Sequence, residues 1–339
     1  MLSPPRIRPS GWRRWASDAT QAPFVSSEVE TLSAAPKCLD FARHERGIRV
    51  VVVAQAIRAA AAQLAATSDT ARLDAEVLMA HALGVSRSDL LLRHMTDPEP
   101  SGFISLIKRR LTLEPVAYII GQQEFYGLTF AVTPAVLIPR GDSEVLVEAA
   151  LAVRPDARRV LDCGTGSGAL LLAVLANLAG AEGIGIDRSG DALGVARANA
   201  AALDLAERAR MQQADWHQPG WAEGYGQFDL ILANPPYVET EADLAPSVRG
   251  HEPAEALFAG ADGLDDYRVL IPQLPGLLAF GGVAMIEIGW AQAEAATAIA
   301  QGCGFSAVLH RDLGDRPRAL ELRLADAVEN PLGNAPRSA

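Results

Sequence analysis

Between residues 48 and 113 the apolar positions recur with the spacing of amphipathic helices. Alanine, the strongest helix former, dominates Gln55–Ala66, and Gly84 lies where the apolar face of a second helix ends. Ser86 and Ser101 each precede a further apolar stretch and are suited to N-cap it. The pattern therefore predicts a small helical bundle.

From about residue 145 the pattern changes to short apolar runs that alternate with helical stretches. The expected strands cover residues 159–162, 183–187, 210–215, 228–233, 283–288, 306–311 and 319–324, and the expected helices cover 169–178 and 191–203. Strands and helices that alternate at this spacing build a mostly parallel, doubly wound sheet with helices on both faces. We therefore predict an α/β, Rossmann-like fold with a seven-stranded sheet after the bundle.

The remaining segments connect or flank these two parts. Residues 114–144 hold aromatic positions around Gly127 and are predicted to form a hairpin linker. Residues 1–47 mix Pro, Arg, Ser and Trp without periodicity and lack the apolar run of a signal peptide. We interpret them as a disordered or spurious extension, the alternative being a transit peptide. The sheet domain would cover residues 145–326, followed by a polar tail at 327–339.

The net charge restricts the class of partner. The chain has 30 basic and 41 acidic residues, so its formal charge is 30 − 41 = −11, with 8 − 5 = +3 in residues 1–50 and 22 − 36 = −14 in the rest. Binding to DNA or RNA rewards clustered Lys and Arg, which this acidic body lacks. Nor does any apolar stretch resemble a membrane span of about 20 residues. We expect neither a direct nucleic-acid partner nor a membrane.

Cysteine and histidine give no sign of a metal site. The three cysteines form no C-x-x-C pair, and the six histidines form no H-x-x-x-H pair. Widely separated cysteines are typical of proteins from a reducing compartment. We predict a cytoplasmic, monomeric protein without a bound metal.

A glycine-rich loop follows the first strand of the predicted sheet and opens a helix. It consists of Gly164, Thr165, Gly166, Ser167 and Gly168. Its glycines allow a tight turn and the close approach of a ligand, and it lacks the Lys of a phosphate-binding P-loop. The spacing differs from that of NAD-binding loops. Together with Asp162 it is similar to the first motif of S-adenosylmethionine-dependent methyltransferases, which implies S-adenosyl-L-methionine as the cofactor.

Side chains that follow the next two strands suit the same cofactor. Asp187 ends the second strand, where a carboxylate can accept both ribose hydroxyls; the alternative is that it N-caps the next helix. Asp215 and Trp216 follow the third strand, at the place where the resemblance implies an adenine contact. An indole face suits stacking on a base, and the alternative for Trp216 is ordinary loop packing.

The run Asn234, Pro235, Pro236 and Tyr237 follows the fourth strand directly. Two prolines cannot continue a central ladder, so the strand must stop and Asn234 must lie at the carboxyl edge of the sheet. The Asn234 side-chain oxygen and the Pro235 carbonyl can each accept one N–H of an NH₂ group, while Tyr237 can pack on its flat face. Methyltransferases that act on adenine N6, cytosine N4 or the glutamine amide share this motif, so it indicates the reaction and leaves the substrate open.

Several longer stretches occur in one order over residues 50–325. They are residues 114–121, 124–127, 136–140, 234–237, 251–257, 262–268 and 287–292. As a set they resemble the protein glutamine N5-methyltransferases, and within them the enzymes that modify class 1 peptide chain release factors. The resemblance implies methylation of the glutamine in the Gly-Gly-Gln motif of such a factor, which modulates translation termination. It also implies that the helical domain helps to hold the factor.

The resemblance distributes roles among the candidate site residues. The glycine loop, Asp187, Asp215, Trp216 and Asn234 would contact the cofactor, and Asn234 to Tyr237 would contact the glutamine and perform the chemistry.

Arg140 and Glu144 are expected on the substrate side. The family usually has a proline where this chain has Gly141, which predicts a more mobile gate here. Alternatively, Arg140 and Glu144 form a surface ion pair of little energetic value.

Three other functions remain open. The first is a glutamine methyltransferase for a large-subunit ribosomal protein, and the second is a DNA or RNA amino-methyltransferase, which the acidic charge disfavours. The third is a non-catalytic nucleoside-binding module, which would not need the run from Asn234 to Tyr237 at the strand edge.

Overall fold

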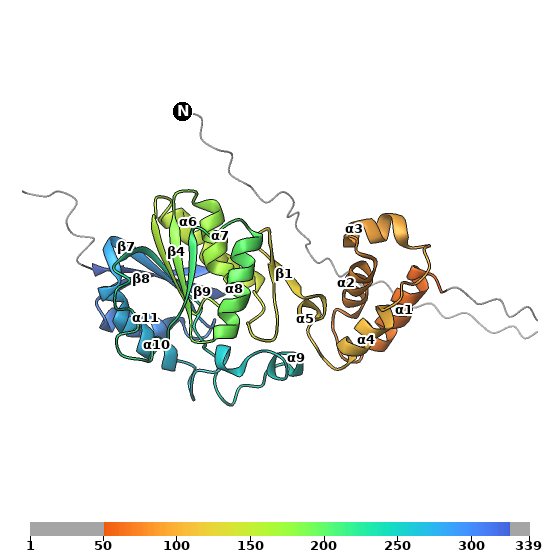
Figure 1. The fold of residues 1–339 in the computed structure, drawn as a ribbon. Coiled ribbons are helices and arrows are strands. Elements are labelled where there is room, and N and C mark those ends of the chain that lie inside the picture. The colour runs from red at the N-terminus through yellow and green to blue at the C-terminus, as the bar shows by residue number, and fades with distance from the viewer. Residues whose placement is uncertain (1–50, 326–339) are drawn as a thin grey trace, which may run out of the picture.

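The computed structural model describes residues 51–325, so the predictions for residues 1–47 and 327–339 lie outside the described residues. Two groups of elements are visible in Figure 1. Helices α1 to α4 lie on one side, the large sheet lies on the other, and α5 and strand β1 lie between them. None of the helices within residues 51–325 has the length and apolar character needed to span a bilayer.

The N-terminal part is helical, as predicted. It contains α1 (Val53–Leu64), α2 (Ala71–Leu83), α3 (Arg87–Asp89), the π-helical turn η1 (Leu90–His94) and α4 (Phe103–Leu111). Gly84 ends α2 with φ 67°, and the Ser86 hydroxyl accepts the Asp89 N–H at 3.0 Å. The prediction that Ser101 caps the fourth helix is wrong. The chain enters α4 through Gly102 at φ 100°, a left-handed conformation that glycine adopts easily, so the N-cap lies one residue later.

The predicted linker contains a hairpin and a helix that the pattern did not reveal. Strands β1 (Gln122–Phe125) and β2 (Leu128–Ala131) pair antiparallel across a two-residue turn with φ 51° at Tyr126 and 74° at Gly127. Before them, α5 (Val116–Ile120) packs Ile119 into the core of the bundle, whereas Tyr118 packs with Val136 and Ile138. Helix α5 therefore joins the two parts.

The C-terminal part is the predicted seven-stranded sheet. Its elements are η2 (Gly141–Ser143), α6 (Glu144–Val153), β3 (Arg159–Cys163), α7 (Ala169–Asn177), β4 (Glu182–Asp187), α8 (Gly190–Ala202), β5 (Ala209–Gln213), β6 (Phe228–Ala233), α9 (Pro246–Arg249), η3 (Ala254–Ala256), α10 (Asp265–Leu270), η4 (Ile271–Gly276), β7 (Leu278–Glu287), α11 (Ala293–Gly302), β8 (Phe305–Arg311) and β9 (Pro317–Leu324). The strand order is β5-β4-β3-β6-β7-β9-β8, and β9 runs antiparallel to both of its neighbours. The prediction of a doubly wound, mostly parallel sheet is confirmed.

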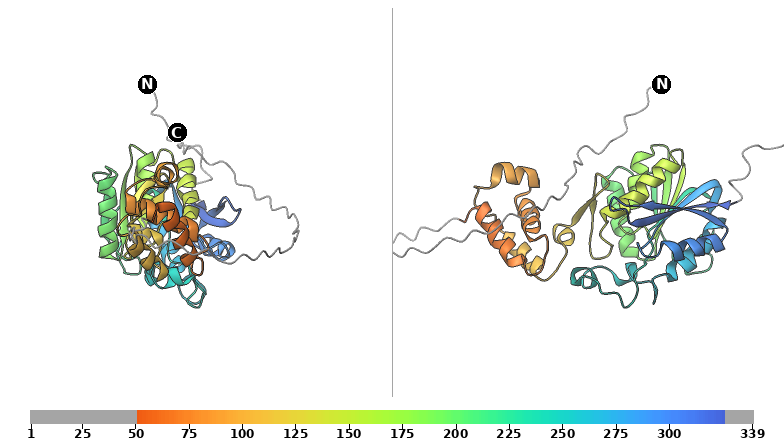
Figure 2. Two further views of the ribbon diagram at one scale, coloured as in Figure 1. Left: turned by 90° about the vertical axis from the view of Figure 1, so that its right-hand side faces the viewer. Right: turned by 180° about the vertical axis from the view of Figure 1, so that it is seen from behind.

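Helices cover both faces of this sheet (Figure 2), and the side chains of its strands build one core on each face. Along β6, Leu230 and Leu232 pack with α6, α7 and α8, whereas Ile231 and Ala233 pack with α10, η4 and α11. Central parallel strands that are buried on both faces read as continuous apolar runs, which is why β6 was recognisable in the sequence.

The strand order reverses between β3 and β6. From β3 the chain passes to β4 and β5 on one side, and β6 then lies on the other side of β3. Ligands of open α/β sheets bind at such a reversal, outside the carboxyl ends of the strands. The register pairs Cys163 with both Ile186 and Ala233, and it pairs Ala233 with Ile286. The next residues, Gly164, Asp187, Asn234 and Glu287, therefore leave four adjacent strands at one level.

A buried asparagine ties the hairpin to the sheet part. Asn199 of α8 is 1% exposed, and its side chain accepts the Ala131 N–H at 2.7 Å. Its amide group donates to the carbonyl oxygens of Ala131 at 3.0 Å and Ser167 at 2.8 Å. One side chain thus satisfies three backbone groups and holds β2 against the glycine loop.

We expect Asn199→Ala to lower the free energy of unfolding by about 2–4 kcal/mol, because three buried backbone groups lose their partner. Urea denaturation followed by circular dichroism measures the change. Asn177→Ala is the matched control, since the exposed Asn177 bonds only its own helix, at Ala173 O. Equal stability losses for the two variants would contradict the proposed tie.

Candidate active site

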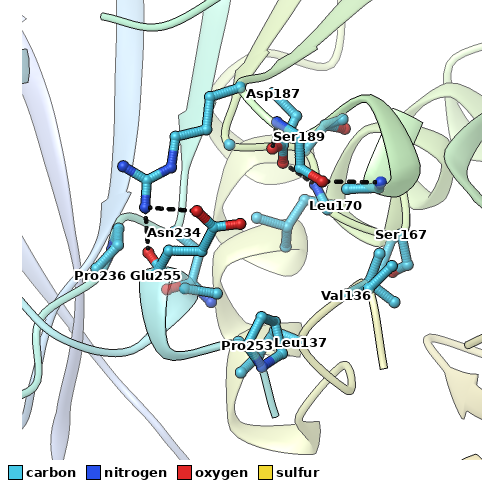
Figure 3. Close-up of a pocket in the computed structure, with 18 of the residues that line it drawn as sticks. Val136, Leu137, Ser167, Leu170, Asp187, Ser189, Asn234, Pro236, Pro253 and Glu255 are labelled. Atoms are coloured by element: carbon cyan, nitrogen blue, oxygen red, sulfur yellow. Dashed lines mark hydrogen bonds and ion pairs between the residues drawn. The ribbon is translucent and has the colours of Figure 1, made fainter. Parts of the chain in front are cut away.

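A cavity opens at the carboxyl ends of β3, β4, β5 and β6, where the strand order reverses (Figure 3). It is lined by Phe125, Ala135, Val136, Leu137, Pro139, Arg140, Ser143, Gly164, Thr165, Gly166, Ser167, Ala169, Leu170, Asp187, Arg188, Ser189, Ala192, Ala214, Asp215, Trp216, His217, Asn234, Pro236, Pro253, Glu255, Ala256 and Asp266. Most of the predicted site residues lie on this wall. Gly168, Pro235, Tyr237 and Glu144 do not.

The glycine loop forms the floor next to β4. Gly164 and Gly166 have φ of 75° and 52°, a conformation that favours glycine. The backbone N–H groups of Gly164 and Thr165 donate to the Ile186 carbonyl at 2.9 and 2.8 Å, which anchors the loop on the neighbouring strand. Gly168 instead N-caps α7 with φ 83°, behind the cavity wall.

The carboxylate of Asp187 lies beside this loop. Its Oδ2 accepts the Gly166 N–H at 3.0 Å, and its Oδ1 accepts the Ser189 N–H at 2.9 Å. Burial raises the pKa of Asp187, and the two backbone N–H groups oppose that shift. The alternative that Asp187 N-caps α8 is wrong, because the Ser189 side chain occupies that position and accepts the Ala192 N–H.

Asp162 lies behind the loop. It is fully buried, and it accepts the Thr165 hydroxyl at 2.7 Å. Burial raises the pKa of Asp162 to about 7, while the Thr165 hydroxyl acts in the opposite direction. Asp162 therefore holds the loop from the protein side and does not line the cavity.

Asp215 and Trp216 line the cavity where β5 ends, next to β4. Trp216 Nε1 donates to Asp266 at 3.0 Å, and the ring lies so close to Gly164 that a Cβ there would be 3.1 Å from it. Asp215 accepts the His217 backbone N–H at 2.9 Å and faces its ring nitrogen at 3.0 Å. Burial would raise the pKa of Asp215, but these His217 contacts outweigh it and lower the pKa.

The predicted acceptor motif leaves the end of β6. Asn234 and Pro236 face the cavity, as Figure 3 shows, whereas Pro235 is buried. Tyr237 does not line the cavity, and its hydroxyl donates to Glu287 at 3.3 Å, so this placement does not support the prediction that its ring packs on the flat face of the substrate group. Its backbone carbonyl accepts the Gln292 side-chain amide at 2.9 Å.

Gly263 and Gln292 support this turn from behind. A Cβ at Gly263 would lie 2.3 Å from the Tyr237 carbonyl oxygen, so no side chain fits there. Gln292 also donates to the Gly263 carbonyl at 3.1 Å. Stretches 262–268 and 287–292 resemble the family in sequence, but the sequence assigns them no role. In the fold, both contact the acceptor motif at the Tyr237 carbonyl.

Arg140 and Glu144 do not pair with each other. Arg140 forms an ion pair with Glu252, and Glu144 accepts the Tyr126 N–H at 2.9 Å at the hairpin turn. Glu252 also accepts the Ile138 N–H at 3.3 Å. The sequence alone did not single out Glu252 or Glu255 as site residues. Both lie in stretch 251–257, one of those that resemble the protein glutamine N5-methyltransferases.

A second ion pair joins the same segment to β4. Arg188 pairs with Glu255 at 3.2 Å, and both line the cavity. Segment 250–256 is therefore held to residues 136–140 on one side and to the end of β4 on the other.

The sheet order, the glycine loop and the acidic residue at the end of β4 define an α/β methyltransferase. The chain matches the model of a methyltransferase domain over residues 155–310 and that of the PrmC N-terminal domain over residues 55–121.

Relatives with known names cover most of the chain. The release factor glutamine methyltransferase of Caulobacter vibrioides is 39% identical over 271 residues, which are 78% of this chain and 92% of that protein. That of Cereibacter sphaeroides is 42% identical over 282 residues, which are 81% of this chain and 99% of that protein. The chain belongs to the family of release factor glutamine methyltransferases.

The cavity wall suits the S-adenosyl-L-methionine on which methyltransferases of this class depend. Gly166 has space for a ligand where a Cβ would stand, and Asp187 offers lone pairs that its two backbone bonds leave free. Val136, Leu137 and Leu170 add an apolar wall.

We expect Asp187→Ala to weaken binding of S-adenosyl-L-methionine by about 10- to 100-fold, because hydrogen bonds to a carboxylate are lost. Isothermal titration calorimetry measures the affinity. Because burial raises the pKa of Asp187, its carboxylate takes up a proton at a higher pH than an ordinary Asp does. The affinity of the native chain should therefore fall as the pH drops through this raised pKa. Glu182→Ala at the exposed start of the same strand is the control. Normal binding by Asp187→Ala would exclude the ribose assignment.

Proposed function

We propose that this chain transfers a methyl group from S-adenosyl-L-methionine to the side-chain amide nitrogen of the Gly-Gly-Gln glutamine in class 1 peptide chain release factors, in the cytoplasm. Its family membership supports the substrate class, because relatives that share about 40% of their residues with it are named for this activity. The observation that carries the reaction type is the placement of Asn234 at the end of β6, on the cavity wall beside the glycine loop.

The chain's own residues would orient the substrate. An amide nitrogen is a poor nucleophile, because its lone pair is delocalised over the carbonyl. Asn234 Oδ1 and the Pro235 carbonyl would each accept one N–H of the glutamine, which fixes the nitrogen and raises its electron density. When bound, the cofactor supplies an electrophilic methyl group on its sulfonium. The amide nitrogen would take the methyl group as the methyl–sulfur bond breaks, with S-adenosyl-L-homocysteine as the second product. The nitrogen then releases its proton to water, so no strong base is required at the start.

Two parts of the site would guide the approach of the factor. Arg140 and Glu252 join the segment before α6 to the segment after α9, next to the cavity. We assign Arg140 to the substrate side of this wall, and we assign Glu144 an indirect role through the hairpin turn. The helical part, residues 48–113, would hold the factor away from the reacting glutamine, and residues 114–144 would link it to the domain of residues 145–326.

The direct test incubates the chain with S-adenosyl-L-methionine and a purified release factor. Mass spectrometry of the digested factor should find one added methyl group on the Gly-Gly-Gln glutamine. A large-subunit ribosomal protein and DNA serve as parallel acceptors. Methyl label on either of these and none on the release factor would contradict the proposal.

We expect Asn234→Ala to lower kcat by about 100-fold, because a nitrogen that is held in the wrong orientation rarely attacks. Single-turnover assays measure the rate, and thermal unfolding checks that the fold is intact. Asn177→Ala, on the far end of α7, should retain native turnover. Native turnover by Asn234→Ala would remove the orienting role from this side chain.

A further inference from the structure

A buried glutamate lies next to the acceptor motif. Glu287 ends β7 and is 1% exposed. Because Ala233 pairs with Ile286 in the sheet, Glu287 leaves β7 at the level at which Asn234 leaves β6. The Tyr237 hydroxyl donates to Glu287 Oε1 at 3.3 Å. The carboxylate therefore contacts the last residue of the motif directly.

Two hydrogen bonds hold Tyr237, and only the one from its hydroxyl involves a carboxylate. Its carbonyl accepts the Gln292 side chain at 2.9 Å, and its half-buried ring packs against the core on that face of the sheet. The two prolines before it restrict the backbone, so a displacement of Tyr237 is transmitted to the Pro235 carbonyl and Asn234. The hydrogen bond between Tyr237 and Glu287 therefore affects the positions of Asn234 and the Pro235 carbonyl, which would hold the substrate.

Charged and titratable groups of several neighbouring elements surround Glu287. Arg318 of β9 is near the carboxylate, and it is itself paired with Asp142 at 2.9 Å and Asp312 at 3.2 Å. From α10, the Tyr267 hydroxyl donates to the Glu287 backbone carbonyl at 3.1 Å. Within residues 51–325, Glu287 Oε2 and Arg318 Nε are buried without a hydrogen-bond partner.

The same surroundings set the protonation of the carboxyl group. Burial raises the pKa of Glu287 to about 7. The Ser143 hydroxyl, close by but outside hydrogen-bonding geometry, and the Arg318 guanidinium oppose this shift, and Asp142 adds to it. Glu287 can therefore change its charge near neutral pH.

We propose that Glu287 is a positioning residue for methyl transfer, whose ionised carboxylate holds the Tyr237 hydroxyl and through it fixes the Asn234–Pro235 acceptor pair. The inference rests on the proposed function, because it assigns a role within the same site. A hydrogen bond to an ionised acceptor is about twice as strong as a neutral one. As pH falls through the pKa of Glu287, the carboxylate is protonated, the bond weakens and turnover falls on the acid side.

The rate test compares native chain, Glu287→Gln, Tyr237→Phe and the double variant between about pH 6 and pH 8.5, a range that brackets the Glu287 pKa. We expect native kcat to fall on the acid side with an apparent pKa of about 7. Each single variant should show a kcat about 10-fold below native at the alkaline end of the range. Its kcat should no longer fall on the acid side (the acid limb of the profile), and its KM for the cofactor should be unchanged. The double variant should lose no more than Tyr237→Phe alone, because both substitutions act on the same bond.

The buried Glu321 of β9 provides a matched control. It accepts His310 and Arg323, which lie away from the cavity, so Glu321→Gln should keep the acid limb. Additive losses in the double variant, or an acid limb that persists in Tyr237→Phe, would overturn the inference.

A second measurement needs no release factor. In chain labelled with ¹³Cζ-tyrosine, the Tyr237 signal should titrate with a midpoint of about 7, and Glu287→Gln should abolish that titration. A Tyr237 signal that does not move would overturn the inference. If the signal titrates but no release factor is methylated, the proposed function fails and the contact between Tyr237 and Glu287 stands.

Discussion

The register of four adjacent parallel strands is the constraint on which the site depends. Because β4, β3, β6 and β7 are aligned by their backbone ladders, Asp187, Gly164, Asn234 and Glu287 reach the carboxyl edge at one level. A slip of one residue in any strand would move its side chains to the other face of the sheet. The apolar side chains on both faces of β6 prevent such a slip, since every residue from Leu230 to Ala233 is fully buried. The two cores thus fix the level at which these polar groups reach the edge of the sheet.

The edge itself is then shaped by residues that cannot continue a strand. Glycines with positive φ turn the chain sharply after β3, and two prolines stop β6 without leaving an unpaired N–H group. Buried carboxylates hold the turns that result: Asp162 binds Thr165, Glu252 binds Ile138 and Arg140, and Glu287 binds Tyr237. Hydrogen bonds from the loops that they hold offset part of their cost of burial, while Asp162 Oδ1 and Glu287 Oε2 stay buried without a partner in the part of the chain that the structure describes.

The strands at the centre of the sheet were predictable, because buried parallel strands are apolar runs bounded by glycine or proline. The glycine loop, Asp187 and the run from Asn234 to Tyr237 were predictable for the same reason, since each follows such a strand. Helix α5 was missed because its five residues, Val116–Ile120, are too short for a 3.6-residue period to be visible. The partner of Arg140 was also missed. Glu252 lies 112 residues away in sequence, and no local pattern can predict a contact that only the folded chain creates.

The central claim is that the end of β6 orients a planar NH₂ group for methylation. A crystal structure of the chain with S-adenosyl-L-homocysteine and a release factor tests it most directly. We expect the Gly-Gly-Gln glutamine to place its NH₂ group within hydrogen-bonding distance of both Asn234 Oδ1 and the Pro235 carbonyl. A glutamine that lies in the cavity with its NH₂ group bonded elsewhere, and with Asn234 turned away from it, would contradict the claim.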